Sequence, residues 1–360
     1  TWRRGPRRNW LRNGEGKAVA RNFLNSIRLL EDRLDSELER DASPLGRIIG
    51  RIALVISGAV LGLVLIVVGI SRNDQATIAF EAGTVTAASF APPDESEIPE
   101  GPLGDAIIRG KAIFDNPGVN AAAYVGNAMA CKNCHLDSGR RAGSSPMWAA
   151  WGKYPQYRNK NKSINTMEDR IMGCFRYSMN APASASGAPP PAGSDIYRDL
   201  QTYFHWLATG APTGKNMVGS GYPELELTST GYDPQRGAPL YDQYCSGCHG
   251  PEGQGAIQPD GTVVYPPLWG NESYNWGAGM ARVDLAARFI KANMPFDRPG
   301  TLTSQEAWDI AAFVDSQERP RDPRQTGSIE DNAKRSFAGQ ESFYGKTVDG
   351  HQLGSGGGAR

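Results

Sequence analysis

Two copies of a Cys-x-x-Cys-His motif constrain this chain more than any other feature of its sequence. They occupy 131–135 and 245–249 and use four of the five cysteines. Two thiols three residues apart can add to the two vinyl groups of one haem, and the histidine that follows then lies beneath the iron. A zinc site built from all four cysteines would need no histidine after either pair. The sequence therefore predicts two covalently bound c-type haems, attached at Cys131, Cys134 and His135 and at Cys245, Cys248 and His249.

Each motif belongs to one of two similar units, which form an internal repeat. An Arg-Gly-x-x-x-aromatic run precedes each motif, at 109–114 and 236–241, and a helical stretch rich in aromatic residues follows at 195–208 and 305–316. This order resembles cytochrome c domains, in which an early helix is crossed by a late one. A glycine in the early helix would let an aromatic side chain approach closely. We predict a mainly α fold with tandem cytochrome c domains at 101–210 and 211–320.

An uncharged apolar stretch, residues 52–70, precedes both units. At about 1.5 Å per residue it extends about 28 Å, close to the thickness of a bilayer core. The charged region before it is long for a cleaved signal peptide. We therefore predict a single transmembrane anchor over 48–71.

The distribution of charge orients this anchor. Residues 1–51 carry twelve Lys or Arg against seven Asp or Glu, whereas Arg72 is the only basic residue between 72 and 108. The positive-inside rule then places the N-terminus in the cytoplasm and both haem domains on the periplasmic or extracellular side of a bacterial cytoplasmic membrane. Over the whole chain, 38 basic residues balance 38 acidic ones, so no nucleic-acid partner is expected.

The remaining segments are predicted to be peripheral. Residues 1–47 form a basic tail with an amphipathic helix over 18–40, which suits either lipid headgroups or another membrane subunit. Residues 72–100 form a polar linker that contains prolines and acids. Residues 321–360 form a polar, glycine-rich tail without a domain of its own.

The second axial ligand of each iron is less directly encoded. In the second unit, Met294 precedes a proline just after the helical run 282–291, and Met280 is the alternative. The first unit has no Met-Pro turn after its motif, but it contains the fifth cysteine, Cys174. On a helix, Arg170, Cys174 and Ser178 fall on one face, and an arginine one turn away favours the metal-binding thiolate. We predict Cys174 as the ligand, with His205, Met172 and Met179 as weaker alternatives.

These residues resemble the thiosulfate dehydrogenase family, diheme cytochromes that join two thiosulfates into tetrathionate. The resemblance covers roughly residues 100–320; it includes both motifs, the helix around Cys174, the run 154–158 and the stretch 266–295. It implies His135 and Cys174 as axial ligands of an active-site haem, with Arg170, Ser178 and Arg158 beside it. It also implies His249 and Met294 at a second haem that passes electrons onward. Some relatives have a lysine before that methionine; this chain has Asn293, so an exchange of lysine for methionine is not expected.

The expected chemistry follows from these ligands. An anionic thiolate holds the first haem at a low potential and a methionine raises that of the second, so electrons run from the first to the second. Thiosulfate, or a similar small sulfur oxyanion, needs cationic neighbours. Those available are Arg158, Arg170, Arg176, Lys160 and Lys162, although a solvated basic loop explains the two lysines equally well.

The expected partners are the sulfur oxyanion, an acceptor cytochrome or oxidase, membrane lipid and further subunits of a membrane complex. The alternative function is that of a non-catalytic diheme electron-transfer subunit of a respiratory or photosynthetic complex.

Overall fold

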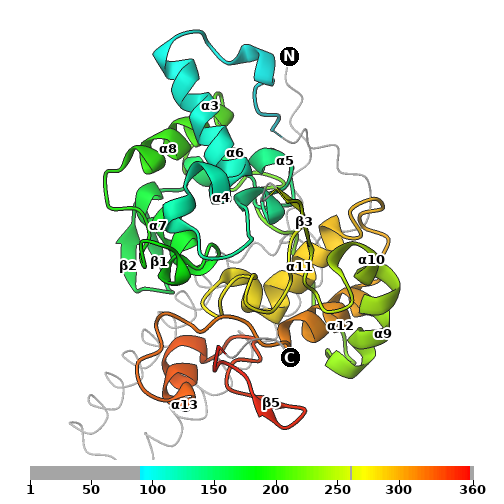
Figure 1. Cartoon of the computed structure of the whole chain (residues 1–360). Coiled ribbons are helices and arrows are strands. Elements are labelled where there is room, and N and C mark those ends of the chain that lie inside the picture. The colour runs from blue at the N-terminus through cyan, green and yellow to red at the C-terminus, as the bar shows by residue number, and fades with distance from the viewer. Residues whose placement is uncertain (1–89, 260–261, 357–360) are drawn as a thin grey trace, which may run out of the picture. The chain divides into compact units, whose positions relative to one another are not determined.

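The computed structural model describes residues 90–259 and 262–356, and Figure 1 shows their arrangement. All of the described residues belong to one compact unit. The predicted basic tail, amphipathic helix and membrane anchor lie outside the described residues. Along the part of the chain that is described, no helix combines the length and the apolar character that crossing a membrane requires.

The first cytochrome-like unit is built on two crossing helices, α3 (Pro102–Asp115) and α8 (Asp195–Leu207). The helix α7 (Met167–Tyr177) begins at Thr166, whose side chain accepts from the Asp169 backbone N–H while the Asp169 carboxylate accepts from Thr166 in return. The shorter elements are η2 (Glu95–Glu97), α4 (Pro117–Asn120), η3 (Ala122–Tyr124), η4 (Cys131–Asn133), α5 (Leu136–Gly139), α6 (Met147–Trp151), β1 (Gln156–Arg158) paired antiparallel with β2 (Ser163–Asn165), and η5 (Ala181–Ala183).

The second unit repeats this plan with α9 (Pro234–Tyr244) crossed by α12 (Ser304–Asp315). Between them lie α10 (Ser246–His249), the hairpin of β3 (Ala256–Ile257) and β4 (Val263–Tyr265), η6 (Gly279–Ala281) and α11 (Val283–Asn293). The mainly helical, cytochrome c-type fold is as predicted.

The two glycines of the repeat occupy equivalent helix crossings. A Cβ added to Gly110 would lie 2.1 Å from the carbonyl oxygen of Asp199, and one added to Gly237 would lie 2.0 Å from that of Asp309. Each crossing is closed by the preceding arginine, which pairs with the same aspartate: Arg109 with Asp199 and Arg236 with Asp309, both at 2.8 Å. The same added Cβ would lie 2.8 Å from the Cβ of an aromatic residue of the late helix, Tyr203 at Gly110 and Phe313 at Gly237, so the predicted close approach of an aromatic residue is confirmed.

The prediction of a polar tail at the C-terminus is wrong for residues 321–356. This segment forms α13 (Ile329–Asn332), η7 (Ala333–Phe337) and the hairpin of β5 (Thr347–Val348) with β6 (His351–Gln352). Its few apolar side chains are spaced so that Phe337 and Tyr344 stack with ring centroids 4.2 Å apart, and both join the main core. The glycine-rich composition concealed this, because four buried apolar side chains, those of Phe337, Phe343, Tyr344 and Leu353, are enough to pack the segment against the main core.

The predicted linker also packs in its final part. Phe90 lies with its ring centroid 5.2 Å from that of Trp148, and Ile98 packs against the same core.

The main core is continuous across both units and the C-terminal segment, since Trp148, Trp276 and Phe337 all belong to it. A smaller cluster around Tyr241 and Trp269 lies within the second unit beside Cys245. The two cytochrome-like units are therefore packed against each other rather than strung on a loose connection.

Candidate active site

The histidines of both motifs are held through Nδ1 by a backbone carbonyl. His135 Nδ1 lies 2.7 Å from the Ser145 carbonyl oxygen, and His249 Nδ1 lies 2.9 Å from that of Pro266. A ring that carries its proton on Nδ1 donates it to this carbonyl, which leaves the Nε2 lone pair free for a metal. Burial lowers the pKa of His135 to about 4 and also lowers that of His249, so both rings are neutral at pH 7.

The surroundings of the motifs fit haem. Burial raises the pKa values of Cys134 and Cys245 to about 12, which marks apolar environments. On the hairpin beside the second motif, Ile257 and Val264 are 45% exposed, and the Tyr265 ring centroid lies 6.4 Å from that of His249. A large, flat apolar group would cover this surface.

Two arginines fit the polar edge of a haem. Among the described residues, Arg140 and Arg141 each have a buried Nη1 that lacks a hydrogen-bond partner. They follow the first motif by only a few residues, and haem propionates are the kind of acceptor that such guanidinium groups need. The residues present therefore fit c-type haem.

The cysteine outside the motifs lies in direct contact with an arginine on α7. Arg170 Nη1 donates to Cys174 Sγ at 2.9 Å, and the Ser178 N–H donates to the Cys174 carbonyl at 2.8 Å. The electrostatic interaction with Cys174 is the first cause that raises the pKa of Arg170. Burial is the first cause that raises the pKa values of Cys131 and Cys134, and the electrostatic interaction with Cys174 is the second. The structure thus brings Cys174 and Arg170 together beside the first attachment motif.

The alternative ligands of the first unit are differently placed. His205 is exposed, and its ring centroid lies 5.4 Å from that of Trp151. Met179 is 2% exposed and Met172 half-buried, both within the main core.

In the second unit, Met280 packs against the main core, whereas Cys245 packs against the smaller cluster. Met294 directly follows α11 and caps it, with its N–H donating to the Ile290 carbonyl at 2.9 Å. Ligation by Met294 and by Cys174 stays a prediction.

A clamp from the second unit holds the C-terminal end of α7, and sequence reasoning missed it. Fully buried Asn275 donates from Nδ2 to the Arg176 carbonyl and to Asn180 Oδ1, both at 3.0 Å, and its N–H donates to the Tyr177 carbonyl. Asn127 Nδ2 donates to the Ser178 carbonyl at 2.8 Å. These contacts join positions far apart in the chain, so one sequence carries no signal for them.

The remaining predicted cations differ in their surroundings. Arg158 ends strand β1 opposite Ser163, and its charge acts on Tyr154, which Arg170 also affects. Lys160 places its ammonium 3.5 Å from the Tyr177 ring centroid, whereas Lys162 is exposed in the turn between β1 and β2. The interpretation as a solvated loop therefore suits Lys162 and does not suit Lys160.

The chain is similar in sequence to known proteins over most of its length. Residues 233–314 match the family described as cytochrome c oxidase, cbb3-type, subunit III. Thiosulfate dehydrogenase of Stutzerimonas stutzeri is 43% identical over 299 residues, which cover 82% of this chain and 95% of that protein. Thiosulfate dehydrogenase of Thiomonas intermedia is 44% identical over 273 residues, which cover 76% of this chain and 85% of that protein.

A solved structure is also similar to this chain. The thiosulfate dehydrogenase (TsdBA) of Marichromatium purpuratum, in its as-isolated form, aligns with a TM-score of 0.73 and 52% identity. The alignment covers 75% of this chain and 58% of that one, so this chain spans less than two thirds of the solved protein.

Proposed function

Because this chain belongs to the thiosulfate dehydrogenase family of c-type cytochromes, we propose that it oxidises thiosulfate to tetrathionate. The observation that carries the proposal is the 2.9 Å contact between Arg170 Nη1 and Cys174 Sγ beside the first haem motif. A purely structural cysteine would need no charged donor. An electron carrier alone would also need no guanidinium group at this position.

The reaction joins two thiosulfate dianions through a new bond between their outer sulfur atoms. Each dianion loses one electron, so one tetrathionate dianion and two electrons are formed. A bound haem supplies an iron that accepts one electron at a time. The residues of the chain bind and orient the anions, because two dianions repel each other until cations offset their charge.

Arg170 is placed to supply that charge. Its guanidinium group contacts Cys174 through Nη1, and further N–H groups are available for an oxyanion. Ser178 follows one turn later on the same helix face, with its backbone held by Asn127. Arg158 would extend the cationic surface from strand β1.

We infer that the first iron takes His135 and Cys174 as axial ligands, and that the second takes His249 and Met294. The neutral, Nδ1-anchored histidines support this, as does the position of Cys174 beside the first motif. A thiolate at one iron and a thioether at the other would drive electrons from the first haem to the second and then to an acceptor cytochrome or oxidase.

We also propose that residues 52–70 anchor the chain in a bacterial cytoplasmic membrane, with the haem units on the periplasmic side. The uncharged stretch and the basic residues before it support this orientation. Extraction of membranes with carbonate should leave the full chain in the pellet and release a chain that lacks residues 1–71.

Steady-state turnover tests the function. The haem-loaded chain should form one tetrathionate for every two ferricyanide ions reduced in the presence of thiosulfate. An intact protein with both haems attached that forms no tetrathionate would contradict the proposal and favour the non-catalytic electron-transfer subunit.

A further inference from the structure

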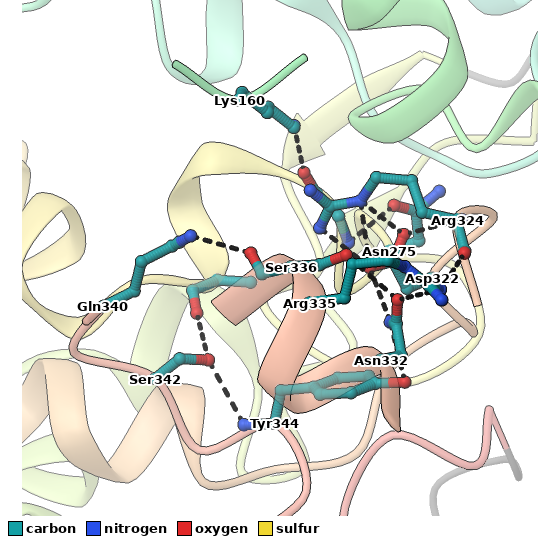
Figure 2. A network of polar contacts seen from close by, with 12 residues as sticks. Lys160, Asn275, Asp322, Arg324, Asn332, Arg335, Ser336, Gln340, Ser342 and Tyr344 are labelled. Atoms are coloured by element: carbon teal, nitrogen blue, oxygen red, sulfur yellow. Dashed lines mark hydrogen bonds and ion pairs between the residues drawn. The ribbon is translucent and has the colours of Figure 1, made fainter. Parts of the chain in front are cut away.

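The Lys160 ammonium lies where three separate parts of the chain meet (Figure 2). Its Nζ donates to the carbonyl oxygen of Gly277 in the second unit and lies 3.5 Å from the ring centroid of Tyr177, the last residue of α7. The residue as a whole is exposed along its stem, but the ammonium itself is enclosed. Within residues 90–259 and 262–356, it forms no ion pair with a carboxylate.

The C-terminal segment, residues 321–356, forms one side of this enclosure. The Arg324 guanidinium lies 5.5 Å from the same Tyr177 ring and makes a forked ion pair with Asp322, at 2.7 Å from Nη2 and 3.0 Å from Nε. The buried Asp322 also accepts from Asn332 Nδ2 at 3.1 Å, and Asn332 donates to the Tyr344 hydroxyl at 3.0 Å. Figure 2 shows this chain of contacts, which orders the C-terminal segment internally, while the Arg324 guanidinium is the group that reaches α7 through the Tyr177 ring.

The backbone at this junction is closely packed around Gly277. A Cβ added to Gly277 would lie 2.4 Å from the Tyr177 ring and 2.9 Å from Asp322 Oδ1. The Gly277 carbonyl that accepts from Lys160 is therefore held between α7 and the C-terminal segment.

The Lys160 ammonium retains hydrogen-bond donors that no carboxylate among the described residues uses. Arg324 is already paired with Asp322, and Arg170 is in contact with Cys174. Lys160 uses one of its three N–H donors, on a carbonyl. Burial lowers the pKa of Lys160 to about 7; Arg324 and Arg170 lower it further, while Asp322 and Cys174 act in the opposite direction. A bound anion would relieve this repulsion.

We propose that Lys160 is a second cation of the thiosulfate site, and that the C-terminal segment is the outer wall that holds it there. The inference rests on the proposed function and adds to it a binding residue, Lys160, and a positioning residue, Arg324. The wall comes from a part of the chain whose sequence predicts only a polar tail.

The test compares variants of the haem-loaded protein by calorimetric titration with thiosulfate and by steady-state kinetics. Lys160→Met should raise both the dissociation constant and KM for thiosulfate about tenfold, with kcat changed less than about threefold. Lys160→Arg, which keeps the charge, should restore most of the affinity. Arg324→Gln should raise KM by about threefold with kcat unchanged, because it loosens the wall without touching the substrate.

Two matched controls separate these effects from a general loss of positive charge. Lys162→Met removes an exposed lysine from the same turn, and Arg321→Gln removes an exposed arginine from the same C-terminal segment. Both should leave the thiosulfate affinity within about twofold of the unsubstituted chain.

The outcomes distinguish this inference from the function on which it rests. If the unsubstituted chain turns over thiosulfate and Lys160→Met binds it equally well, the inference falls and the function stands. If the unsubstituted chain binds thiosulfate without forming tetrathionate, the function falls, and the binding of Lys160→Met still decides the role of Lys160. If it does not bind thiosulfate at all, both fall.

Discussion

The affinity for thiosulfate should depend on pH through Lys160. Its pKa, lowered by burial to about 7, means that the ammonium is about nine-tenths protonated at pH 6 and about one-tenth protonated at pH 8. Because only the protonated form attracts a dianion, affinity falls as the pH rises. Suppose that the chain with neutral Lys160 binds thiosulfate about tenfold more weakly than the chain with protonated Lys160. The affinity averaged over the two forms is then about fivefold lower at pH 8 than at pH 6. KM should therefore rise about fivefold between pH 6 and pH 8.

Two substitutions make this assay specific for Lys160. Lys160→Arg keeps a charge that does not titrate in this range, so KM should stay low and nearly flat. Lys160→Met removes the charge, so KM should be high and equally flat. Initial rates with ferricyanide as acceptor, at constant ionic strength, give KM at each pH. A rise in KM with the same midpoint in Lys160→Met would refute the assignment, because another group would then be titrating.

Three further substitutions and one control test the fold that holds the site. Gly237→Ala forces a methyl group to within 2.0 Å of the Asp309 carbonyl, so we expect a loss of about 3 kcal/mol and a melting temperature lower by roughly 6–12 °C; Gly173→Ala in α7, which meets nothing within 4 Å, should not destabilise the protein. Phe337→Ala should cost about 3 kcal/mol by removing the buried stack on Tyr344, and circular dichroism melting would show it. Asn275→Ala removes the donor to two buried acceptors at the end of α7, the Arg176 carbonyl and Asn180 Oδ1; it should cost about 2–4 kcal/mol and raise KM, and an unchanged melting temperature would contradict the clamp.

The sequence predicted those features that depend on residues close together in the chain. The haem motifs are pentapeptides whose function requires their spacing, and the Arg-Gly runs encode a helix crossing that repeats in both units. The contact between Arg170 and Cys174 follows from helix periodicity alone, because residues four apart share a face. These features need no knowledge of the rest of the chain.

The features that the sequence did not predict depend on contacts between residues far apart in the chain. Asn275 binds Asn180 across 95 positions, and nothing around either residue indicates the other. The polar composition of the C-terminal segment predicts a tail, yet Phe337 and Tyr344 pack into a core that includes residues of the two preceding units. For the same reason, Lys160 and Lys162 look alike in sequence and differ only once Tyr177 and Gly277 are in place.

The coordination of the first iron tests the account most directly. Low-temperature electron paramagnetic resonance of the oxidised, haem-loaded protein should show two low-spin species, one of them typical of a thiolate-ligated haem. In Cys174→Ala that species should disappear while the signal of the second haem stays unchanged. A spectrum that is identical in the two proteins would mean that Cys174 does not bind the iron, and the basis for sulfur chemistry at this site would be lost.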